Sequence, residues 1–127
     1  MRIRYNPIHK RKRLGAWVLE GRREKDFIDK DFIRQNLNIV ILVLLRRQPF
    51  SGFELIKIIN NASGVLVSSG TVYPLLKSFE EDGLINKIPS GEKNIRYKVV
   101  NKGKVDKILN NHIEAFKNLE NLMRSAR

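Results

Sequence analysis

Five polar side chains between residues 68 and 77 could bind a polyanion: Ser68, Ser69, Thr71, Tyr73 and Lys77. Hydroxyl groups and the amides of a helix N-terminus bind phosphate oxygens, and a lysine ammonium reaches either a phosphate or a guanine edge. We therefore expect these residues to bind double-stranded DNA. Tyr73 could instead be a core aromatic, and its spacing does not decide between the two.

A second set of candidate residues lies in and between two short β-runs, at residues 84–88 and 95–100. Side chains alternate along a strand, so Arg96 and Lys98 share one face. Such a hairpin could be an ordinary sheet edge. Because it follows two capped helices on a basic chain, we interpret it as a wing that touches the DNA backbone. Its candidate contacts are Lys93, Asn94, Arg96 and Lys98.

Positive charge is concentrated at the N-terminus. Residues 1–25 hold nine Lys+Arg and two acidic residues, a net of +7 out of the chain's +12. Such blocks are typical of mobile arms that bind phosphates or a minor groove. The candidate contacts in this arm are Arg2, Arg4, Lys10, Arg11, Lys12 and Arg13. The arm could also be a solvated tail without a target, and Trp17 could dock on the core or on a partner chain.

Composition limits the remaining classes of function. A chain of 127 residues with 42% apolar content can form one folded core. The net charge favours an acidic partner, either nucleic acid or an anionic membrane surface, unless it only solvates the chain. The longest apolar run, residues 39–45, is too short to cross a bilayer. The absence of cysteine fits a cytoplasmic protein, here one associated with the nucleoid.

The sequence offers no support for catalysis. It has no Gly-rich phosphate loop and no His/carboxylate cluster, and its two histidines are His9 and His112. We therefore predict that the chain is not an enzyme and holds neither a cofactor nor a metal ion.

The apolar pattern predicts three helices before the hairpin. Residues 31–47 form one helix that is apolar around most of its circumference, which suggests contact with another subunit. Ser51 and Glu54 form a capping box that opens the next helix, with Phe53, Leu55, Ile56 and Ile59 facing inward. The third helix has Pro74 near its first turn and ends at a left-handed Gly83. Its inward residues are Val72, Leu75, Leu76 and Phe79.

From residue 101 a long helix carries apolar residues at heptad spacing. The seam consists of Val105, Leu109, His112, Phe116, Leu119 and Met123, spaced by four, three, four, three and four residues. This spacing predicts a homodimer. His112 on the seam is either a packed neutral side chain or a pH sensor, and we favour the first because ionising it there would be costly.

These elements predict a mainly α protein with a small β-hairpin, a winged helix-turn-helix with a long C-terminal dimerisation helix. We expect a basic arm and linker at residues 1–27, the DNA-binding domain at 28–100 and the dimerisation helix at 101–127.

Residues 37–104 resemble the PadR family of winged-helix transcription regulators, in order and at the family's spacing. The runs that carry the resemblance are Leu42–Leu45 before Pro49, Ser51-Gly-Phe-Glu-Leu55, Ser69-Gly-Thr-Val-Tyr-Pro-Leu-Leu76, Phe79-Glu-Glu-Asp-Gly-Leu-Ile85, and Arg96-Tyr97 leading to Gly103. The chain departs from the family at Ser51-Gly52-Phe53, where the family usually has His-Gly-Tyr.

The resemblance implies that Ser69, Thr71, Tyr73 and Lys77 are the exposed groups of a recognition helix. It also implies that the C-terminal helix pairs two subunits. Some relatives bind flat aromatic ligands at the dimer interface, but this seam has no Trp, so a small aromatic effector stays undecided.

The predicted function is a sequence-specific transcription regulator of double-stranded DNA, a repressor that binds palindromic sites as a homodimer. One alternative is a DNA-organising or segregation protein that coats repeated sites. Another is a winged-helix adaptor for protein or RNA, with the arm as its nucleic-acid tether. A footprint of one short palindrome would favour the regulator over both.

Overall fold

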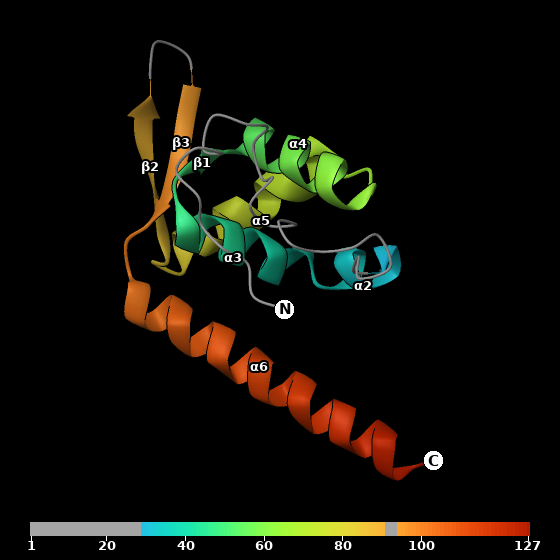
Figure 1. Cartoon of the computed structure of the whole chain (residues 1–127). Coiled ribbons are helices and arrows are strands. Elements are labelled where there is room, and N and C mark those ends of the chain that lie inside the picture. Colours follow the sequence, from blue (N-terminus) through green and yellow to red (C-terminus); the bar gives the residue numbers. More distant parts are fainter. Residues whose placement is uncertain (1–28, 91–93) are drawn as a thin grey trace, which may run out of the picture.

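The computed structural model describes residues 29–90 and 94–127. Short helices pack beside a small antiparallel sheet of order β1-β3-β2, and one long helix runs along the outside (Figure 1). A winged helix-turn-helix with a long C-terminal helix is therefore confirmed. The elements are α2 (Lys30–Gln35), α3 (Leu37–Arg47), β1 (Phe50–Ser51), α4 (Gly52–Ser63), α5 (Ser69–Glu81), β2 (Ile85–Ser90), β3 (Asn94–Val99) and α6 (Lys102–Ser125).

The expectation of one continuous helix over residues 31–47 is wrong, because Asn36 divides it into α2 and α3. The Asn36 side chain donates from Nδ2 to the carbonyl of Phe32 at 2.9 Å, and its backbone leaves the helical region with φ −118°. Asparagine side chains compete in this way with the helical ladder. Asp29 caps α2 by accepting from the amides of Asp31 and Phe32.

The core of the single chain covers most of the apolar circumference of α3. Five of its residues are buried, namely Leu37, Ile41, Leu42, Leu44 and Leu45, whereas Val43 is 41% exposed. The apolar pattern around α3 therefore needs no second subunit to explain it, because α4, α5, the sheet and the first turn of α6 supply the same core.

The capping box of α4 is confirmed. The Glu54 amide donates to Ser51 Oγ at 3.0 Å, and the Ser51 amide donates to Glu54 Oε1 at 2.9 Å. The prediction that Phe53 faces inward is wrong, since its side chain is 65% exposed and Ile58 packs into the core instead.

Helix α5 buries Val72, Leu76 and Phe79 as predicted. Pro74 lies inside the helix rather than in its first turn. Proline has no amide hydrogen, so Pro74 cannot donate the helical hydrogen bond to the carbonyl of Gly70. Gly70 is exposed, so water can satisfy that carbonyl. Gly83 has φ +76°, which confirms the left-handed residue expected after this helix.

The first turns of α6 belong to the folded domain. Val105 is fully buried in the core of its own chain, so its assignment to a dimer seam is corrected: no surface of this side chain remains for a partner. Ile108 and Leu109 pack partly against the same core. Arg46 at the end of α3 holds Asp106 through two hydrogen bonds, Nε to Oδ1 at 2.8 Å and Nη2 to Oδ2 at 3.2 Å.

Asp106→Asn should lower the thermal unfolding midpoint at neutral pH. The hydrogen bond from Arg46 holds the pKa of Asp106 below its ordinary value. A depressed folded-state pKa gives stability that is present above the unfolded value, about 3.9, and is lost as the pH falls through the folded value. The difference in midpoint between wild type and Asp106→Asn should therefore shrink on acidification below about pH 4.

Asp31→Asn is the matched control, because it removes the exposed local pair with Arg34 and such pairs contribute little. If the unfolding midpoint of Asp106→Asn stayed below that of wild type by the same amount down to low pH, the ion-pair explanation would be contradicted.

Candidate nucleic-acid interface

The exposed face of α5 carries the predicted recognition residues. Ser69, Thr71 and Lys77 are all exposed. Helical geometry places Lys77 on the side opposite the buried residues Val72 and Phe79, so its exposed side chain points away from the core.

The N-terminus of α5 leaves backbone donors for a ligand. Ser68 is the N-cap residue but makes no side-chain capping hydrogen bond. Its Oγ lies 3.4 Å from Thr71 Oγ1 instead, and both residues are exposed. First-turn amides that no side chain caps are suited to a phosphate oxygen, so the predicted chemistry of this turn fits its geometry.

Tyr73 is neither a core residue nor a freely projecting one. It is 43% exposed, and its ring lies against the start of α4. A Cβ atom at Gly52 would come 2.5 Å from Tyr73 Cζ and 2.7 Å from its Oη. Gly52 therefore allows α4 and α5 to approach this closely, which the sequence did not reveal.

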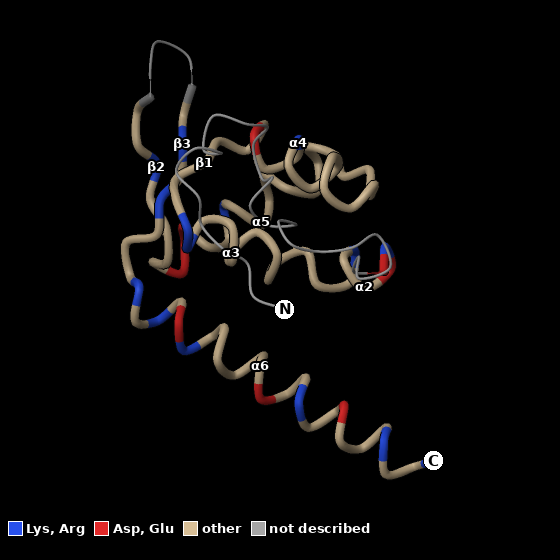
Figure 2. Tube along the Cα trace, viewed as in Figure 1, with Lys and Arg blue, Asp and Glu red and all other residues tan. Residues whose placement is uncertain are grey.

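The wing presents Arg96 and Lys98 on one face, as predicted. In the antiparallel register Arg96 lies opposite Ile88, and Lys98 lies opposite Asn86. Figure 2 shows basic residues on both strands of the hairpin. Asn94 pairs with Ser90 at the far end of the described strands, whereas Lys93 lies outside the described residues.

Arg96 also makes a contact that the sequence did not predict. Its Nη2 donates to Glu54 Oε2 at 3.2 Å, which joins the wing to the first turn of α4. The capping box in the sequence predicts where the Glu54 carboxylate lies on α4. It does not predict that Arg96 of β3 passes beside that carboxylate.

Tyr97 anchors the same strand from the other side. It is buried at 6% exposure. Burial raises the pKa of its hydroxyl, and the charge of Glu80 and the neighbouring Tyr73 raise that pKa further. Tyr97 therefore stays neutral and packed at physiological pH.

The predicted arm contacts Arg2, Arg4, Lys10, Arg11, Lys12 and Arg13 lie outside the described residues.

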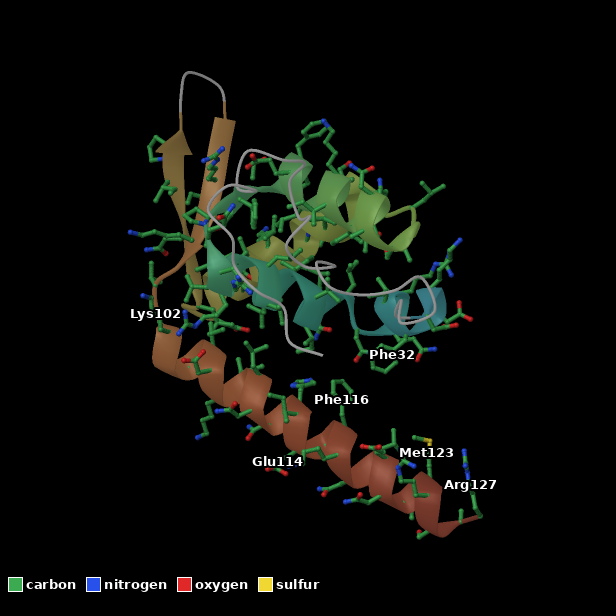
Figure 3. All side chains as sticks on the ribbon, in the orientation of Figure 1. Phe32, Lys102, Glu114, Phe116, Met123 and Arg127 are labelled. Atoms are coloured by element: carbon green, nitrogen blue, oxygen red, sulfur yellow. The ribbon has the colours of Figure 1, made fainter. Side chains whose placement is uncertain are left out.

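Beyond its anchored start, α6 carries exposed apolar side chains. Phe116 points toward Phe32 of α2, with ring centroids 5.5 Å apart (Figure 3). Ile113, Leu119, Leu122 and Met123 are each at least half exposed. His112 is half-buried, with Nδ1 2.9 Å from the carbonyl of Ile108 and its ring at the edge of Phe116.

Within residues 29–90 and 94–127, no three His, Asp or Glu side chains gather in a way that could hold a metal ion. No helix of the described chain is both long and apolar enough to cross a membrane.

Comparison with known proteins agrees with this geometry. A family model described as the transcriptional regulator PadR-like family matches residues 41–106, which is 66 of the 127 residues. No curated protein sequence matches.

Solved structures give the same result. A transcriptional regulator from Clostridium thermocellum is 21% identical with a TM-score of 0.65, covering 77% of this chain and 96% of its own. A PadR-like transcription factor from Bacteroides fragilis is 26% identical with a TM-score of 0.61, covering 77% and 97%. A PadR-like regulator from Bacillus cereus is 21% identical with a TM-score of 0.61, covering 73% and 96%.

Gly52→Ala should destabilise the domain by about 1–3 kcal/mol, because the added methyl group must displace the Tyr73 ring or separate α4 from α5. Urea unfolding measures this destabilisation. Gly103→Ala is the matched control, since its nearest neighbour, Asn101 Oδ1, would lie 3.9 Å away in ordinary contact. Equal stability of the two variants would contradict the close packing of Tyr73 on Gly52.

Proposed function

The chain belongs to the transcriptional regulator PadR-like family, and from this premise we propose that it is a repressor that binds palindromic double-stranded DNA as a homodimer. The observation that carries the proposal is the joint exposure of two surfaces. The outward face of α5 presents Thr71 and Lys77, and the wing, whose strand β2 contacts α5, presents Arg96 and Lys98.

The two surfaces serve different parts of a duplex. A helix of this kind enters the major groove, where Lys77 can reach a guanine or a phosphate. Arg96 and Lys98 on the wing bind the backbone, which positions the protein without reading sequence. The basic arm at residues 1–27 would add phosphate contacts beside the site.

The apolar part of α6 supports the homodimer. An exposed apolar stripe on α6 consists of Phe116, Leu119 and Met123. Exposing such a surface to water is unfavourable, and a second copy of the same helix would cover it. The seam of this proposal runs from Leu109 to Met123, without Val105. A two-fold dimer presents two recognition helices to the two halves of a palindrome.

Repression follows from occupancy. A small dimer that covers a promoter site excludes other proteins from it, which requires no catalytic function and no further domain. We accordingly place the protein in the cytoplasm, on the nucleoid.

The recognition surface can be tested once selection from random duplexes has identified an operator. Tyr73→Phe combined with Lys77→Ala removes the hydroxyl and the ammonium while the ring stays on Gly52. The double variant should weaken operator binding by about 1–3 kcal/mol for each of the two groups that it removes. Titration of a labelled operator measures this weakening.

Lys117→Ala is the control, because it removes one exposed lysine from α6, away from the proposed DNA surface. If this control weakened binding as much as the α5 variant did, the effect would reflect net charge alone and α5 would not be the reader. Protection of one short palindrome in a footprint supports a regulator, and spreading protection would favour a DNA-organising protein instead.

The dimer can be tested by sedimentation. Phe116→Asp with Leu119→Asp should yield monomers, because unpaired carboxylates in an apolar interface are costly. Asn118→Asp with Asn121→Asp adds the same charge to the opposite face of α6 and should stay dimeric. A dimer that survives the first pair of substitutions would overturn the α6 seam.

A further inference from the structure

Glu54 is an acidic residue at the edge of the proposed DNA surface, where simple electrostatics would disfavour it. Its carboxylate is engaged on both oxygens. Oε1 accepts from the Ser51 amide at 2.9 Å, and Oε2 accepts from Arg96 Nη2 at 3.2 Å. The Glu54 side chain is only 19% exposed, whereas that of Arg96 is 44% exposed.

This contact follows from the register of the sheet. Ser51 lies opposite Arg96 in the β1–β3 pair, and Ser51 is also the N-cap of α4. The third residue of that helix, Glu54, folds back over the cap and therefore meets the strand residue that pairs with the cap. The position of Glu54 relative to Arg96 is therefore set by the strand pairing of Ser51 with Arg96 and by the capping hydrogen bonds between Ser51 and Glu54.

A guanidinium group has five N–H donors in a fixed fork. The contact with Glu54 uses one of them, at Nη2, so others remain on the exposed part of Arg96. An arginine that is already held loses less rotamer freedom when it binds a phosphate.

We propose that Glu54 is a positioning residue for DNA binding, which holds the Arg96 guanidinium on strand β3 of the wing so that its free donors meet a backbone phosphate. The inference rests on the proposed function and assigns a role within it to a residue that does not itself touch DNA. It predicts that removing the Glu54 charge weakens DNA binding, whereas electrostatics alone predicts unchanged or tighter binding.

The test is Glu54→Gln. Glutamine at this helix position still accepts from the Ser51 amide, so the capping box is kept. Its amide group cannot pair with Arg96 as a carboxylate does, and the substitution adds one unit of positive charge to the protein. Glu81→Gln is the matched control, because it makes the same change of charge at an exposed site of α5.

Electrostatics alone predicts that both variants bind the selected operator as tightly as wild type or more tightly. Positioning predicts that Glu54→Gln binds it roughly threefold to thirtyfold more weakly, which lies within the range of coupling between contacting residues. This weakening should disappear when Arg96→Gln is already present, because no guanidinium is then left to hold.

Salt dependence separates this role from a purely structural one. Arg96→Gln should lower the slope of log affinity against log salt by about 0.9 for the phosphate it contacts. Glu54→Gln should move the slope in the same direction, and Glu81→Gln should not. The unfolding midpoints of all variants, measured alongside, should match that of wild type closely enough for each to be folded during binding.

Unchanged or tighter binding by Glu54→Gln would overturn the inference, and tighter binding would show that the carboxylate competes with phosphates for Arg96. A weakening that persists in the Arg96→Gln background would overturn it as well. If wild type preferred no duplex at all, the proposed function would fail and this inference with it, so the two failures are distinguishable.

Discussion

The pairing of a two-residue strand with the wing is the constraint on which the rest of the structure depends. Phe50 and Ser51 lie opposite Tyr97 and Arg96, and Phe50 and Tyr97 are both buried. The burial of Phe50 and Tyr97 determines the register of the hydrogen bonds between β1 and β3, because a slip by one residue would turn Phe50 out of the core. Because Ser51 is also the N-cap of α4, the same pairing sets where the helix-turn-helix begins relative to the wing.

Helix α5 is tied to that point through Tyr73. Its ring rests on Gly52, one residue after the paired serine, so α5 approaches the junction as closely as the backbone of α4 permits. Val72 and Leu76 on the neighbouring face are fully buried, which prevents α5 from rotating. The distance between the exposed side chains of α5 and the wing is therefore a property of packed side chains and strand register rather than of loop length.

Local signals in the sequence predicted most of the elements but few of the contacts between them. Three features that depend only on residues close in sequence were confirmed. They are the capping box at Ser51, the left-handed Gly83 and the alternating residues of the hairpin. A strand of two residues has no periodicity to detect, so β1 was missed. The inward direction of Phe53 and the seam role of Val105 were wrong because helical spacing identifies an apolar face without identifying its partner.

The long helix α6 shows how one element can serve two surfaces. Val105 in the core and the Arg46–Asp106 pair hold its first turns to the domain, and Phe116 contacts Phe32 further along, while Ile113, Leu119, Leu122 and Met123 stay exposed. These contacts set the direction of α6, and a rigid helix carries that direction on to its C-terminal end. In the proposed dimer, the spacing of the two recognition helices would therefore be decided by the packing around Val105 and Asp106 as much as by the seam itself, and substitutions there would act on the choice of half-site spacing without touching DNA.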